Sequence, residues 1–85
     1  MGQGEKRLAR MRSNPKNDWT MDDVAVVCRE YGLDLEKPHR DSHWSVFNPR
    51  TKIIMTIPCH GRVKGFYIKR FVKLVDGSAG GLDDN

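Results

Sequence analysis

His43, in the middle of the chain, stands among residues of the kinds that transfer protons and bind phosphate. An unperturbed imidazole pKa near about 6.5 lets a histidine take up a proton at neutral pH. Metal-free RNA cleavage needs such a base for the ribose 2′-hydroxyl, cations for the charge on phosphorus, and a proton for the departing 5′-oxygen. The residues near His43 in the sequence that could support these steps are Arg40, Asp41, Ser42, Arg50 and Lys52.

The pattern around His43 also fits a structural role. A half-buried strand histidine can use its two ring nitrogens to satisfy neighbouring backbone groups. His60, which follows Pro58-Cys59, has two interpretations as well: it could contact phosphate or supply the second proton, or it could be a solvated loop residue. Residue types alone leave both interpretations open for both histidines.

A second group of basic residues follows His60. The backbone N–H groups at the start of a helix favour anions, and a helix is expected here from about residue 66. These cations could grip phosphate or could form an ordinary solvated face. They are Arg62, Lys64, Lys69, Arg70 and Lys73.

The two cysteines indicate no covalent or metal framework. Cys28 lies in a helical pattern and Cys59 follows a proline. The two cysteines are far apart in the sequence, so neither has a second cysteine at the spacing of a metal site. We expect free thiols in a reducing cytoplasm, and we expect no metal and no cofactor.

A helix is predicted from residue 20 to residue 31. Thr20 as N-cap with Asp23 at the third helical position forms a capping box. Apolar residues then recur at helical spacing from Val24 to Tyr31, and Gly32 is placed to end the helix.

Short extended segments follow, at residues 35–39, 42–47 and 53–57, and then a second helix at 66–75 that ends at Gly77. The order α-β-β-β-α predicts a small two-layer α+β domain, with a three-stranded antiparallel sheet and both helices on one face of it. Trp44 must face away from His43. If Phe47 is a core residue, His43 lies at the edge of the buried face, and Trp44 and Val46 line the open face.

Charge and composition place one domain between two terminal segments. Of the 85 residues, 15 are Lys or Arg and 11 are Asp or Glu, and three of the acids lie in the last ten positions. This balance favours a polyanionic partner. We expect a flexible basic arm at 1–13, or one short turn of helix there that docks on the domain, then a folded domain at 14–77 and a disordered acidic tail at 78–85. No apolar run reaches the roughly 20 residues that span a bilayer, so no membrane association is expected.

Several short motifs, taken in order, resemble the HicA family of toxins. The resemblance covers about residues 12–76. It departs from the family at Asp41, where the family has glycine, and at Gly65, where proline is frequent. The motifs are Asn14-Pro15-Lys16-Asn17, Ser42-His43 with Phe47, Thr56-Ile57-Pro58 with His60, and Val63-Lys64 leading into Tyr67-Ile68-Lys69-Arg70-Phe71.

The resemblance implies a fold like that of a double-stranded-RNA-binding domain and a ribonuclease that cleaves mRNA without a metal. It also implies a partner antitoxin of the HicB type that keeps the enzyme inactive. The family's catalytic histidine falls on His43 and the preceding serine on Ser42. Asp41 could orient the His43 ring and raise its pKa, or could repel the incoming phosphate.

Two further function classes stay open at this point. The same basic face could belong to an RNA-binding module without catalysis. An exposed face could also serve to pair with another protein chain, which is compatible with a toxin that an antitoxin covers.

Overall fold

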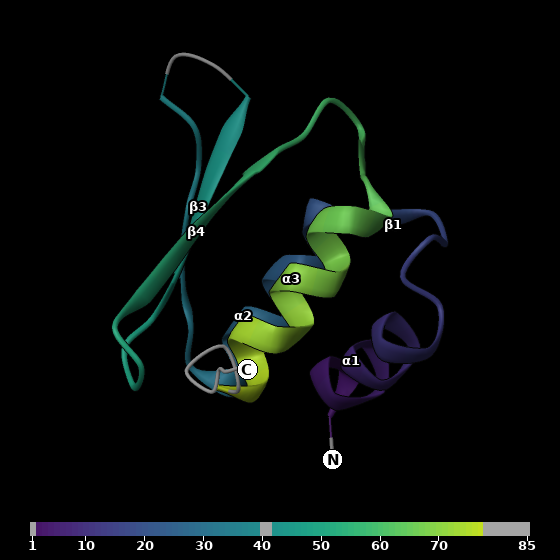
Figure 1. The fold of residues 1–85 in the computed structure, drawn as a ribbon, viewed down its shortest axis with the longest axis horizontal. Coiled ribbons are helices and arrows are strands. Elements are labelled where there is room, and N and C mark those ends of the chain that lie inside the picture. The colour runs from purple at the N-terminus through teal and green to yellow at the C-terminus, as the bar shows by residue number, and fades with distance from the viewer. Residues whose placement is uncertain (1, 40–41, 78–85) are drawn as a thin grey trace.

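The chain forms three helices and two antiparallel sheets (Figure 1). This computed structural model describes residues 2–39 and 42–77, so Arg40, Asp41 and the acidic tail at 78–85 lie outside the described residues. The elements in chain order are α1 (Gln3–Ser13), β1 (Trp19–Thr20), α2 (Met21–Tyr31), β2 (Asp34–Glu36), β3 (His43–Asn48), β4 (Ile53–Pro58), β5 (Arg62–Val63) and α3 (Gly65–Asp76).

The larger sheet has the order β2-β3-β4, with both pairs antiparallel. Its register places His43 opposite Pro58 and Asn48 opposite Ile53. All three helices lie on one side of this sheet, and the chain after β4 crosses over them to reach β5, which pairs with β1 (Figure 1). The expected small α+β fold with a three-stranded antiparallel sheet is therefore confirmed, whereas α1 and the β1–β5 pair were not expected.

Helix α2 begins and ends as its sequence predicts. The Thr20 hydroxyl accepts from the Asp23 N–H at 3.4 Å, and the Thr20 N–H donates to the Asp23 carboxylate at 3.0 Å, so the capping box is complete. Gly32 ends the helix at φ 74°, a left-handed conformation that glycine adopts without a Cβ penalty. The boundaries of α3 likewise lie within one residue of those expected.

The segment expected to be a flexible arm or one short docked helical turn forms the 11-residue helix α1. Leu8 and Met11 are buried in the common core, and the Gly4 N–H donates to the Glu30 carboxylate at 3.0 Å. Arg7 binds Asp23 at 2.9 Å. These contacts come from residues far along the chain, and tertiary packing rather than local propensity stabilises most helices of this length.

The face assignment of β3 differs from the sequence expectation. Val46 is fully buried and Trp44 packs against the core, so these residues face the helices. Because side chains alternate along a strand, His43 and Phe47 face the open side of the sheet. Because Val46 and Phe47 are both apolar, the hydrophobic pattern alone could not show which face of β3 packs against the helices.

No helix within residues 2–39 and 42–77 is long and apolar enough to cross a membrane.

Candidate functional site

His43 begins β3 at the end of the sheet opposite the β3–β4 hairpin, and it is exposed. Its strand partner is Pro58, the last residue of β4. Because side chains alternate along a strand and Val46 is buried, the His43 side chain lies on the other face of β3. No helix lies on that side of the sheet (Figure 1).

Ser42 contacts His60 rather than His43. The Ser42 Oγ and the His60 Nε2 are 2.9 Å apart, although the two residues are separated by 18 positions. The backbone supports this approach, because the Cys59 N–H donates to the Ser42 carbonyl at 2.9 Å and extends the β3–β4 ladder by one step. Two histidines and a serine are thus brought to one end of the sheet.

The loop after His60 carries two of the predicted phosphate-binding cations. Gly61 turns the chain at φ 105°, a conformation that favours glycine, and a β-bridge joins His60 to Arg62. Arg62 binds Asp18 at 2.5 Å on the exposed surface. Lys64 is the exposed N-cap residue of α3 and makes no side-chain capping bond. Arg62, Lys64 and Asp18 line a shallow hollow of about 280 Å³. The other residues that line it are Lys16, Asn17, Val63 and Gly65.

Two predicted cations, Arg50 and Lys52, lie at the other end of the sheet. Both belong to the β3–β4 hairpin, about five residues along β3 from His43, or roughly 17 Å at the usual rise per residue. Arg50 donates to the Tyr31 carbonyl at 3.2 Å and to the Val75 carbonyl at 3.5 Å. A guanidinium at the carboxyl ends of two helices is a structural contact, since it satisfies carbonyls that have no helical partner.

Lys69 also lies apart from His43. It lines a hollow of about 400 Å³ on the face of α3 toward α1, beside Arg12 and Asp76. Arg12 and Asp76 form a two-pronged ion pair there, at 2.5 and 3.0 Å, and the bond to Asp76 raises the pKa of the Arg12 guanidinium. Of the predicted site residues, only His43, Ser42, His60, Arg62 and Lys64 can be assigned to the same end of the molecule.

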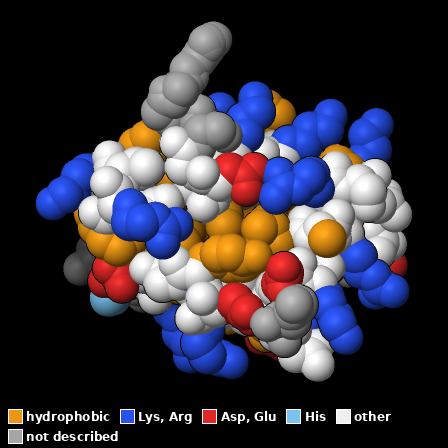
Figure 2. All heavy atoms as spheres, turned by 90° about the horizontal axis from the view of Figure 1, so that it is seen from below, with side chains coloured by type: hydrophobic (Ala, Val, Ile, Leu, Met, Phe, Trp, Pro, Cys, Tyr) orange, Lys and Arg blue, Asp and Glu red, His pale blue; other side chains and the backbone are white. Residues whose placement is uncertain are grey.

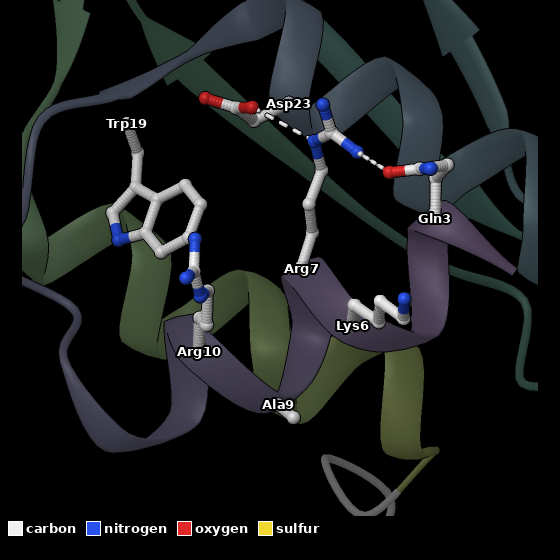
Figure 3. Close-up of a pocket in the computed structure, with 7 residues that line it drawn as sticks. All are labelled: Gln3, Lys6, Arg7, Ala9, Arg10, Trp19 and Asp23. Atoms are coloured by element: carbon white, nitrogen blue, oxygen red, sulfur yellow. Dashed lines mark hydrogen bonds and ion pairs between the residues drawn. The ribbon is translucent and has the colours of Figure 1, made fainter.

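A hollow of about 540 Å³ opens along α1 and is not lined by any predicted site residue (Figure 3). Arg7 points into it between Gln3 and Asp23, to which it is bonded. Trp19 forms part of its wall, but only 5% of its surface is exposed and its indole N–H donates to the Asn14 carbonyl at 2.9 Å. We therefore assign this hollow to the packing of α1 rather than to chemistry.

Charges of both signs are mixed on one face of the molecule. Figure 2 shows Lys and Arg side chains spread over one face, with carboxylates between them and a hydrophobic area near the centre. Interspersed charges of both signs weaken the field that a polyanion would experience there. This face is a poor candidate for a nucleic-acid interface.

The thiols are placed for packing. Cys28 is buried in α2, and burial raises its pKa to about 12, so it carries no thiolate at neutral pH. Cys59 is half-buried and packs against the core. Within the part of the chain that the structure describes, no three His, Cys, Asp or Glu side chains cluster as metal ligands would.

Sequence reasoning found the residues of this site but missed the Ser42–His60 contact. The contact depends on the register of β3 against β4 and on the turn at Gly61, and neither can be read from residue types. The only available signal was that both residues flank predicted strands.

Comparisons with models of protein families, with curated proteins and with solved structures give no significant match to this chain.

Proposed function

We propose that this chain is a metal-independent endoribonuclease of the HicA type that cleaves mRNA, with His43 as a proton-transfer residue. The observation that carries the proposal is the exposed position of His43 on the open face of the sheet, beside the Ser42–His60 pair. A histidine held for structure alone would be expected on the covered face, where its ring nitrogens could bond buried groups.

In this proposal His43 removes the proton of the ribose 2′-hydroxyl, and the resulting oxyanion attacks the adjacent phosphorus. The cations nearest the site, Arg62 and Lys64, contact the phosphates on either side of the scissile bond. Charge-assisted bonds to phosphate are about twice as strong as neutral ones, so these contacts would fix the RNA in register. Arg40 and Asp41 lie outside the described residues, and their roles stay as the sequence predicts them.

A HicB-type antitoxin would cover the β4 edge of the sheet. Two large hydrophobic side chains there, Ile54 of β4 and Phe66 of α3, are 61% and 62% exposed, and they line a hollow of about 440 Å³ with Met55, Thr56, Tyr67 and Arg70. The Arg70 guanidinium lies 5.6 Å from the centre of the Phe66 ring. Aromatic and arginine side chains are enriched in protein interfaces, which supports a protein partner at this surface.

The test is incubation of the purified full chain with a long RNA in EDTA, followed by gel analysis. We expect cleavage by the parent protein, and a loss of at least about 100-fold in His43→Ala, the usual effect of removing a general base. His39→Ala is the matched control, because the His39 ring is exposed, its Nε2 lies 3.4 Å from the Glu36 carboxylate, and it is not part of the Ser42–His60 pair. It should cleave like the parent. Equal cleavage by His43→Ala and the parent would remove His43 from the reaction.

A non-catalytic RNA-binding module is the second candidate. The cluster of Lys16, Arg62 and Lys64 around the start of α3 favours it, because these cations could hold phosphates without any contribution from His43. This function predicts a salt-dependent mobility shift with intact RNA in every lane. The gel described above separates the two candidates directly.

A further inference from the structure

The hydrogen bond between Ser42 and His60 gives the site a second oriented imidazole. We propose that His60 protonates the departing 5′-oxygen of the cleaved RNA and that Ser42 positions the His60 ring for this step. The proposal rests on the ribonuclease function above and names the proton donor that this function requires. Its starting observation is the 2.9 Å separation of Ser42 Oγ and His60 Nε2.

The backbone places the two histidines close enough to serve one phosphodiester. Ser42 lies opposite Cys59 through a ladder bond of 2.9 Å. Paired residues of an antiparallel ladder have Cα atoms roughly 5 Å apart, and successive Cα atoms are about 3.8 Å apart. His43 lies one residue into the ladder from that pair and His60 one residue outward, so their Cα atoms are within roughly 10 Å of each other.

The two imidazoles meet at the end of the sheet rather than within it. His43 is the first residue of β3, and His60 follows the last residue of β4 by two positions. In an in-line displacement the attacking and departing oxygens lie on opposite sides of phosphorus. A phosphodiester bound between the two rings would have a base at one oxygen and an acid at the other.

The Ser42 contact determines which His60 nitrogen would exchange its proton. A hydroxyl can accept from Nε2–H in both the charged and the neutral ring, which leaves Nδ1 as the nitrogen that gains and loses a proton. The bond from phosphorus to O2′ forms as His43 takes the 2′ proton. The bond from phosphorus to O5′ breaks as His60 gives its Nδ1 proton to O5′. The products are a 2′,3′-cyclic phosphate and a 5′-hydroxyl, and no co-reactant is needed.

A rival explanation is that the Ser42–His60 bond only fixes the loop between β4 and β5. A purely structural bond would affect folding, and it would affect all substrates alike. A proton donor would affect only substrates whose leaving group needs a proton. The two explanations are therefore separable by changing the leaving group and not the protein.

The experiment compares two short RNAs of the same sequence with one scissile bond each. One RNA is natural, and in the other a sulfur replaces the bridging 5′-oxygen. A thiol has a pKa near about 8.5, so a thiolate departs without protonation. We expect His60→Ala to cleave the natural RNA at least about 100-fold more slowly than the parent. On the sulfur-substituted RNA it should come within about 10-fold of the parent, whereas His43→Ala should be slow on both.

Ser42 is tested by rescue and by the pH profile. Ser42→Ala should lower the rate on the natural RNA, and Ser42→Thr, which retains the hydroxyl, should recover most of it. The alkaline limb of the rate profile reports loss of the acid's proton, so it should disappear in His60→Ala and persist in His43→Ala. His39→Ala serves again as the histidine control, and thermal unfolding of each variant checks its fold.

Equal losses on the two RNAs in His60→Ala, or an alkaline limb that survives this substitution, would overturn the role of His60. Parent-like cleavage by His60→Ala beside an inactive His43→Ala would do the same and leave the ribonuclease proposal intact. Two intact RNAs after incubation with the parent protein would instead refute the ribonuclease proposal, and the role of His60 with it.

Discussion

Asn48 joins the hairpin end of the sheet to the end of α3. Its side chain is fully buried, its amide N–H donates to the Leu74 carbonyl at 2.7 Å, and its carbonyl accepts from the Arg50 N–H at 2.9 Å. The Leu74 carbonyl is one of the last four of its helix and also accepts from the N–H of Gly77, the C-cap residue, at 3.2 Å. One buried amide therefore satisfies backbone groups of two elements.

Replacing Asn48 with alanine should destabilise the fold. The Leu74 carbonyl and the Arg50 N–H would each lose a partner, and a cavity would open, so we expect a loss of about 2–3 kcal/mol in the free energy of unfolding. Urea denaturation of the parent and the variant measures it. Asn17→Ala is the matched control, because Asn17 is exposed and its side chain makes no hydrogen bond to another described residue. A loss below about 0.5 kcal/mol in Asn48→Ala would show that water replaces these bonds.

Residue types in the sequence were sufficient to select His43 and His60, because imidazole chemistry depends on the side chain itself. They were insufficient to place His43 on a face. The apolar Phe47 has the parity of His43, and the polar Asn48 has the parity of the buried Val46, so the two faces of β3 look alike in the sequence. Asn48 is tolerated on the core face only because both its amide groups are bonded, which no pattern reveals.

The start of helix α2 is determined by residues close to each other in the sequence, Thr20 and Asp23. Burial of the Asp23 carboxylate is the largest influence on its pKa and would raise it. The bonds from Arg7 and Thr20 outweigh burial and hold the pKa below its usual range. A carboxylate with a lowered folded pKa stabilises the fold above its unfolded pKa of about 3.9, and this contribution is lost as the pH falls through the folded value.

Asp23→Asn should therefore cost stability at neutral pH and little in acid. We expect a loss of about 1 kcal/mol at pH 7, typical of a helix cap, and a smaller difference from the parent as the pH falls below about 3. Urea denaturation at several pH values measures both. Asp22→Asn is the matched control in the same turn, where only the helix dipole acts and about 0.5 kcal/mol is expected. A difference that stays constant with pH would contradict the role of the charge.

Helix α1 shows the opposite case, an element that local signals do not predict. Its sequence offers few apolar residues, and its N-cap Gly2 makes no side-chain bond. It is held by contacts with α2, including a close approach at Gly4, where an added Cβ would lie 2.5 Å from the Glu30 Cβ. The β1–β5 pair has two residues in each strand, which is too short for a periodic signal. Both elements arise from packing between segments distant in sequence.

At the scale of the whole molecule, the excess of basic residues does not by itself locate an RNA-binding surface. Arg7 and Arg12 are bound to carboxylates, and Arg50 is bound to helix carbonyls. Composition counts all of these cations equally, whereas only those near the end of the sheet lie where RNA would meet His43. The composition could thus favour a polyanionic partner but could not say where on the surface such a partner would bind.

The salt dependence of RNA binding tests this distinction between cations. Each phosphate neutralised by a lysine releases condensed counterions, so the logarithm of affinity falls with the logarithm of salt concentration, by about 0.7 per contact on single strands. We expect Lys64→Gln to reduce the magnitude of this slope by about 0.7–1. Lys6 belongs to α1, the helix that lies away from the sheet (Figure 1). We expect Lys6→Gln to leave the salt slope unchanged.

Both variants carry the same net charge, so they differ only in where the charge was removed. The measurement is a series of titrations of labelled RNA at increasing salt, made with His43→Ala so that the RNA stays intact. If Lys6→Gln lowered the slope as much as Lys64→Gln, RNA would be binding to the overall positive charge rather than to the end of the sheet. A change confined to Lys64→Gln would place a phosphate beside the start of α3, within reach of the loop that carries His60.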